Sequence, residues 1–197
     1  MPNNLRRADW LVEIRELNEL FLSYLRVLAS GGQACLGLPR RVVRRLRDTD
    51  PAALDRVAEL PTALFCLNLN QPAQRQGFIP PARVSEQMRV SLAVMILSNA
   101  RNMARNRAFE ARMFLHLSGE DVEQLRAMPP QDLLSLANSP DILSCAFADG
   151  GLRWPALLRD DKPEAARMLI LIALQPDLAA PELRLSGPAD LGRRSFG

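Results

Sequence analysis

Five arginines in one short segment are the residues whose type and spacing best suit a chemical task. They fill five of the eight positions from 40 to 47, and the segment 38–48 carries a net charge of +4. A guanidinium group can bind a phosphate or a carboxylate through two parallel hydrogen bonds. The segment therefore predicts contact with DNA phosphates or with an acidic protein, and the alternative is a helix face that is merely solvated. The five residues are Arg40, Arg41, Arg44, Arg45 and Arg47.

A second basic run follows further along the chain. Arg101 and Arg105 stand one helical turn apart, and Asn102 and Asn106 lie beside them. Arginine and asparagine side chains can reach the edges of bases in the major groove of DNA. We expect these residues either to extend a DNA-binding surface or to line the polar face of a long helix.

The sequence lacks the residue patterns that most enzymes need. Its only histidine, His116, stands among apolar neighbours, which is typical of a packed structural residue, and no second histidine could complete a metal site with it. No glycine-rich phosphate loop and no G-x-S-x-G nucleophile motif occurs. The acidic pair Glu120-Asp121 falls at an expected helix start, where the helix dipole explains it. We therefore predict a protein that is not an enzyme and that uses no metal or cofactor.

Composition and cysteine usage favour a folded protein of the cytoplasm. The 197 residues are 48% hydrophobic and 24% charged, which provides enough apolar material for a buried core. The three cysteines, Cys35, Cys66 and Cys145, are too few and too scattered for a disulfide framework. The first residues lack the apolar segment of a signal peptide, and the apolar stretch 168–174 is too short to cross a membrane.

The chain contains an internal repeat. When the sequence is shifted by 79 residues, 38–68 lies over 117–147 without a gap and 10 of 31 positions are identical, where chance would give about two. The charge is not repeated, because 38–48 has a net charge of +4 and its counterpart 117–127 a net charge of −2. The predicted division is a first copy over 1–70, a linker over 71–81, a second copy over 82–150, and a C-terminal helix with a loose tail over 151–197.

Each copy begins with a long helix. Apolar residues recur at three- and four-residue steps up to Gly31-Gly32 in the first copy and from Pro80-Pro81 onward in the second. One copy alone cannot bury such a face, whereas two copies can bury it against each other about an approximate two-fold axis. We therefore predict a mainly α-helical protein whose two copies form an intramolecular pseudo-dimer. The expected contact residues on the long helices are Leu17, Phe21, Tyr24, Ile96 and Met103.

Two short helices and an extended segment follow the long helix in each copy. The second short helix should begin at Pro51 or Pro130, because proline fits the first turn of a helix, where its missing N–H is not needed. Ser118 and Asp121 have the spacing of a capping box, which would start the first short helix of the second copy. The first short helices are expected over 40–48 and 119–127, the extended segments over 64–69 and 143–148, and a last helix over 161–175.

The end of the second copy has a characteristic order of residues, in which a leading proline is followed by a leucine-alanine pair and then by a cysteine, and the end of the first copy matches this order more faintly. The stretch PPQDLLSLANSPDILSCAF fills 129–147, and DPAALDRVAELPTALFCLN fills 50–68. With the helices before it, each copy resembles the FlhD subunit of the bacterial flagellar master transcriptional activator, an all-helical protein. Two departures are clear: the step from alanine to cysteine is one residue longer here, and the family chain is single rather than doubled.

The resemblance implies a regulator that pairs with itself, binds a second subunit similar to FlhC and helps that complex to engage promoter DNA. It also implies that Cys66 and Cys145 lie near the contact between the copies and face each other, as free thiols in a reducing compartment. The competing hypothesis is a protein–protein adapter whose arginine face docks an acidic partner and never touches nucleic acid. Both hypotheses leave higher oligomers open, and neither involves a membrane.

Overall fold

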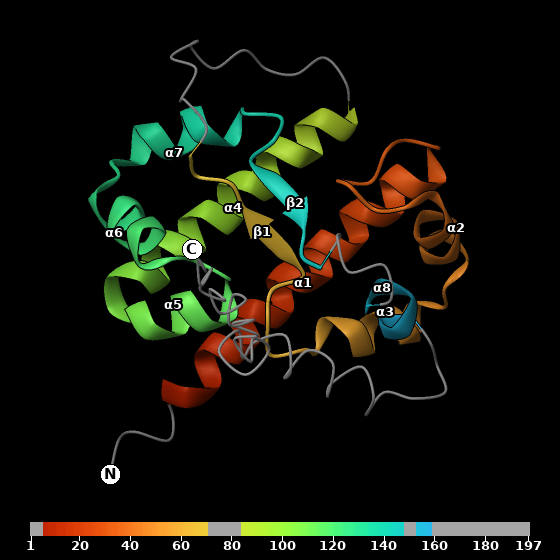
Figure 1. Ribbon diagram of the computed structural model, residues 1–197, viewed down its shortest axis with the longest axis horizontal. Helices are drawn as coiled ribbons and strands as arrows, with labels where there is room; N and C mark the ends of the chain where they lie inside the picture. The colour runs from red at the N-terminus through yellow and green to blue at the C-terminus, as the bar shows by residue number, and fades with distance from the viewer. Residues whose placement is uncertain (1–5, 71–83, 148–152, 159–197) are drawn as a thin grey trace, which may run out of the picture.

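The computed structural model describes residues 6–70, 84–147 and 153–158, which form eight helices and two short strands (Figure 1). The prediction of a mainly α-helical protein is thus confirmed. The expected linker over 71–81 and the expected helix over 161–175 lie outside the described residues. In the part that is described, no helix combines the length and the apolar character needed to cross a membrane.

Two long helices form the centre of the molecule. Helix α1 (Arg6–Ser30) and helix α4 (Val84–Asn106) pack against each other, and Figure 1 shows both running through the middle of the protein. Gly32, with φ of +66°, turns the chain after α1, in a conformation that glycine adopts without strain. The five residues expected between the copies all lie in one continuous hydrophobic core: Leu17, Phe21, Tyr24, Ile96 and Met103.

Short helices cover both long helices in the same manner. Helices α2 (Arg40–Asp48) and α3 (Pro51–Ala58) pack on α1. Helices α6 (Gly119–Ala127) and α7 (Pro130–Ala137) pack on α4. The two pairs begin and end 79 residues apart, which is the shift of the sequence repeat, and α2 and α6 have the bounds that the sequence predicts.

Local sequence rules explain where these short helices start. Pro51 and Pro130 occupy the first turn of α3 and of α7. At the start of α6 the hydroxyl of Ser118 accepts a hydrogen bond from the N–H of Asp121 at 3.0 Å. The carboxylate of Asp121 in turn accepts one from the N–H of Ser118 at 2.8 Å. The predicted capping box is therefore confirmed.

One strand from each half joins the halves in an antiparallel ribbon. Strand β1 (Phe65–Leu67) pairs with strand β2 (Leu143–Cys145). In this register Phe65 lies opposite Cys145, and Cys66 lies opposite Ser144. Because side chains alternate along a strand, Cys66 and Cys145 point to opposite faces of the ribbon.

The expectation that Cys66 and Cys145 face each other is therefore wrong. The strands pair one residue away from the register that would place the two cysteines opposite each other, and a one-residue offset reverses the face. Cys145 is buried, whereas Cys66 is partly exposed. Both are free thiols, as is Cys35, whose carbonyl oxygen lies 3.8 Å from the Sγ atom of Cys145.

The halves differ where the long helix ends. In the second half α4 ends at Asn106, Arg107 takes a φ of −150°, and a further helix α5 (Ala108–Phe114) begins. The first half has turns rather than a helix over 31–39. Helix α5 was not predicted, and it is held by a contact far away in sequence: the ring of Phe114 stacks on that of Trp10 with the centroids 4.0 Å apart.

A last short helix brings the chain back to the first half. Helix α8 (Arg153–Leu157) contacts α2. Its Trp154 is buried, and the indole N–H donates a hydrogen bond to the carbonyl oxygen of Ala146 at 2.7 Å. The tryptophan therefore fixes α8 to the end of the strand ribbon while α8 covers part of α2.

A buried asparagine on α1 closes the end of α3. The side-chain amide of Asn18 donates to the carbonyl oxygens of Ala58 and Thr62 at 3.2 and 2.9 Å. Its carbonyl oxygen accepts the N–H of Leu64 at 2.9 Å. Asn18 thus satisfies carbonyl groups that a helix end leaves without intrahelical partners, and it leads the chain into β1.

A buried arginine on α4 has the same task at the end of α7. The guanidinium group of Arg89 donates to the carbonyl oxygens of Ala137, Asn138 and Ser139 at 3.1, 3.0 and 2.6 Å. It also pairs with Glu86 at 2.6 Å, which balances the buried charge. The side chain of Arg89 is only 4% exposed, so this network belongs to the core.

Candidate nucleic-acid interface

The arginine-rich helix α2 turns an apolar side inward and a basic side outward. Val42 and Leu46 are buried against the rest of the first half. The hydroxyl of Thr49 donates to the carbonyl oxygen of Arg45 at 2.7 Å and so closes the last turn. The five arginines predicted to bind an anion are all exposed: Arg40, Arg41, Arg44, Arg45 and Arg47.

Few acidic groups neutralise this basic side. The Nε of Arg47 donates to the carboxylate of Asp48 at 2.9 Å, and this hydrogen bond lowers the pKa of the Asp48 carboxyl. Among the described residues, no hydrogen bond or ion pair engages the guanidinium groups of Arg40, Arg44 and Arg45. No described residue therefore occupies these groups.

The second predicted pair of arginines lies on α4, away from α2. Arg105 donates from Nε and Nη2 to the carbonyl oxygen of Arg126, at 3.2 and 3.1 Å, and thereby caps the end of α6. Arg101 is half-buried, and its Nε has no hydrogen-bond partner in the described part of the chain. Since α2 and α6 lie at opposite ends of the molecule in Figure 1, the structure does not bring Arg101 and Arg105 to the arginines of α2.

The counterpart of α2 in the second half has the opposite charge. Glu120 and Glu123 are exposed on α6, and Glu123 pairs with Arg126 at 2.8 Å. An acidic surface repels phosphate, so α6 cannot share a phosphate-binding role with α2. The basic surface of α2 is therefore not repeated on α6.

His116 is a packed residue, as expected, and part of the contact between the halves. Its Nε2 lies 3.0 Å from the carbonyl oxygen of Ala63 and 3.1 Å from the hydroxyl of Thr62, so this nitrogen carries the proton and donates to Ala63. Its ring meets that of Phe147 edge-on, with the centroids 5.4 Å apart. Burial lowers the pKa of His116, and the hydrogen bond to Ala63 opposes this effect only in part. The lowered pKa keeps the ring neutral at neutral pH.

The cysteines are poor nucleophiles. Burial raises the pKa of the Cys35, Cys66 and Cys145 thiols, and thiols in this state hold their protons at neutral pH. Within residues 6–70, 84–147 and 153–158, no group of three metal-ligating side chains forms. Comparison of the chain with protein-family models, with curated proteins and with solved structures finds no match.

Proposed function

We propose that this protein is a non-enzymatic subunit of a transcriptional regulator, which contacts duplex DNA through α2 and binds a second regulatory protein similar to FlhC. The observation that supports the proposal is the exposed row of five arginines on one nine-residue helix. A surface needs far fewer positive charges than this for solubility. Three of the guanidinium groups form no hydrogen bond or ion pair within the described residues.

The dimensions of α2 suit a phosphate contact. A helix of nine residues is about 13 Å long, and each DNA strand carries a phosphate about every 3.4 Å along the axis, so the helix can face several phosphates. Because Val42 and Leu46 anchor the helix, the arginines are presented from a fixed backbone rather than from a loop. Contacts of this kind supply affinity without sequence specificity, which agrees with a subunit whose partner reads the promoter.

We further propose that the two halves are FlhD-like copies fused into a pseudo-dimer. Support comes from the equal spacing of the short helices, from the packing of α1 on α4, and from the ribbon to which each half adds one strand. An antiparallel pairing of two equivalent strands is what a two-fold axis between the copies would produce.

The DNA proposal is tested by fluorescence anisotropy with a labelled generic duplex at several salt concentrations. We expect binding by the full chain that weakens as salt rises. The triple variant R40E/R44E/R45E should reduce the slope of log K against log salt by about three, since each lost phosphate contact contributes about 0.9. The matched control reverses three exposed arginines on other helices, Arg15, Arg112 and Arg126, and should leave the slope near that of the wild type.

Two results would refute the proposal. One is that the protein, alone and together with its co-encoded partner, fails to bind duplex DNA at low salt. The other is that the triple variant and its control lose the same affinity. A pull-down that recovers one acidic protein in stoichiometric amount, and loses it with the triple variant, would instead favour the adapter hypothesis.

A further inference from the structure

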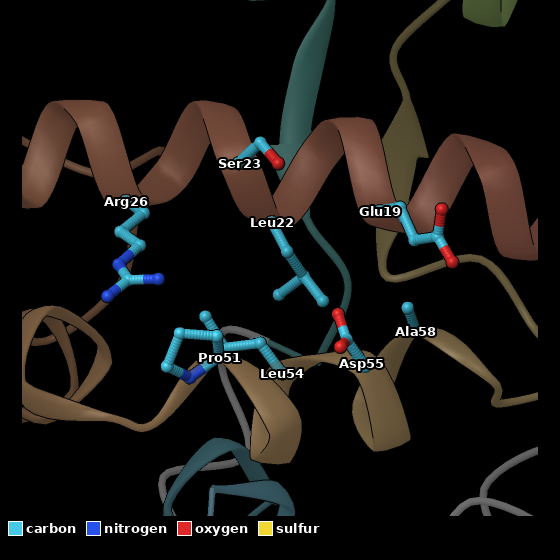
Figure 2. A pocket seen from close by; sticks show the side chains of 8 residues that line it. All are labelled: Glu19, Leu22, Ser23, Arg26, Pro51, Leu54, Asp55 and Ala58. Carbon is cyan, nitrogen blue, oxygen red and sulfur yellow. The ribbon is translucent and has the colours of Figure 1, made fainter.

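A groove of about 320 Å³ lies between α1 and α3 in the first half of the molecule (Figure 2). Leu22 and Leu54 are buried at its base, one from each helix. A volume of this size is at the lower end of the range for small-molecule sites. The groove is therefore large enough for a small organic ligand.

The charged residues of the groove are separated by sign. Figure 2 shows the carboxylates of Glu19 and Asp55 toward one end and the guanidinium group of Arg26 at the other. Glu19 already accepts a hydrogen bond from Arg15 at 2.8 Å. The side chains of Asp55 and Arg26, by contrast, make no hydrogen bond or ion pair within the described residues, although the nearby Arg15 attracts the Asp55 carboxylate electrostatically.

The rise per residue of α1 sets the distance between the acidic and the basic end of the groove. Glu19 and Arg26 are seven residues apart on α1, so their backbones are separated by about 10 Å along the axis. Figure 2 shows the carboxylate of Asp55 between Glu19 and Arg26 along the groove, so a shorter ligand can span from Asp55 to Arg26. A linear molecule with charges of opposite sign at its two ends can therefore meet both, with its apolar middle on Leu22 and Leu54.

The second half does not repeat these charges. By the shift of 79 residues, Asp55 corresponds to Leu134 and Leu22 to Arg101. Arg26 corresponds to Arg105, which is occupied at the end of α6. The combination of two acidic groups, one free arginine and a leucine base thus belongs to the first half alone.

We infer that the groove binds a free amino acid with a guanidinium or ammonium group at the end of its side chain, such as L-arginine. The cationic end lies between Glu19 and Asp55, and the α-carboxylate pairs with Arg26 through two parallel hydrogen bonds. The alkyl chain covers Leu22 and Leu54. This binding does not depend on whether α2 contacts DNA.

Isothermal titration calorimetry on the full chain tests both ends of the ligand separately. L-arginine should bind, while agmatine, which lacks the carboxylate, and norvaline, which lacks the guanidinium group, should each bind at least about tenfold more weakly. A peptide with one internal arginine and blocked ends mimics an arginine side chain of a protein partner, because it has the guanidinium group but no free carboxylate. It should bind as weakly as agmatine.

Two variants assign each end of the ligand to a residue of the groove. The Arg26→Gln variant should bind L-arginine only as tightly as the wild type binds agmatine, because the carboxylate of the ligand has lost its partner. In Asp55→Asn, L-arginine should bind about tenfold more weakly than to the wild type. The matched controls are Arg112→Gln and Asp50→Asn, two exposed residues outside the groove, which should bind as the wild type does. Circular dichroism shows whether each variant is folded, and the ligand series on the wild type needs no variant.

Three results would overturn the inference. The first is the absence of any heat of binding for L-arginine up to about 10 mM. The second is an affinity that neither Arg26→Gln nor Asp55→Asn changes. The third is a blocked peptide that binds as tightly as L-arginine, since this would assign the groove to a side chain of a protein partner instead of a free amino acid.

Discussion

The two halves of the molecule close the same helix end with different residues. In the first half Asn18, from the middle of α1, holds the chain after α3. In the second half Arg89, from the beginning of α4, holds the chain after α7. The shift of 79 residues would pair Asn18 with Leu97 and Arg89 with Trp10, so neither capping residue is repeated.

The comparison shows which properties the two halves share and which they do not. Helix bounds and the apolar residues that cover the long helices recur, since both halves must bury the same kind of surface. Polar groups that satisfy the backbone can come from any neighbouring position that reaches. The net charge of α2 and of α6 is under still less constraint, which is how one fold carries a basic and an acidic end.

The largest effect should come from Asn18→Leu, which places in the first half the residue type found at the corresponding position of the second. The substitution would leave the buried carbonyl of Thr62 and the N–H of Leu64 without partners, so we expect a loss of about 3–4 kcal/mol in the free energy of unfolding. Urea denaturation measures the loss. A stability equal to that of the wild type would mean that the asparagine is dispensable.

Arg89→Met should have the next largest effect. Methionine keeps an apolar stem of similar length but loses the bonds to three carbonyl oxygens, of which those of Asn138 and Ser139 belong to partly exposed residues that water can reach. We expect a loss of about 2–3 kcal/mol. The same denaturation experiment also asks whether the halves unfold together. Two separate transitions in either variant would show that each half folds independently.

Gly37 and His116 occupy corresponding positions, and both have a positive φ, of 88° and 57°. Glycine adopts this conformation freely, whereas alanine does not. Gly37→Ala should therefore cost about 1 kcal/mol of stability, and Gly37→Asn less, because asparagine tolerates the left-handed region. Equal losses for alanine and asparagine would show that the backbone conformation is not what limits this position.

The smallest effect at neutral pH concerns the titration of His116. Burial lowers its pKa in the folded state below the usual 6.5, so the unfolded chain takes up the proton first as the pH falls. The stability contribution of the neutral ring is complete above pH 6.5 and is lost as the pH falls from there through the folded-state pKa.

The variant His116→Asn cannot titrate in this range and keeps a residue type suited to a positive φ. Urea denaturation at pH 7.5 and at acid pH should show a smaller loss of stability on acidification for this variant than for the wild type. An identical acid sensitivity in both proteins would place the responsible group elsewhere.

Much of the fold could be predicted because its signals are local. Prolines at 51 and 130 and the capping box at 118 fix helix starts through backbone chemistry that involves only neighbouring residues. Helix α5 could not be predicted in this way, since its Phe114 depends on Trp10, more than a hundred residues earlier. The register of the ribbon, which turns Cys66 away from Cys145, likewise depends on how two distant segments meet.

The candidate site was predictable to a similar extent. The alternation of Val42 and Leu46 with arginines sufficed to place those arginines outside. The capping role of Arg105 was not visible, because a basic residue on a helix gives no sign of the carbonyl that it will reach. Asn18 and Arg89 did leave a signal that was not used: each is a polar residue at a position that the three- and four-residue spacing assigns to the apolar face.

The strand ribbon has a consequence for assembly. Strand β1 pairs with a strand from the other half of the chain. The same pairing can therefore form between the first half of one molecule and the second half of another. Covalent connection favours the closed monomer at low concentration. Refolding at high concentration should therefore leave a fraction of exchanged dimers, each made of two chains that have traded halves, and dilution should return them slowly to monomers.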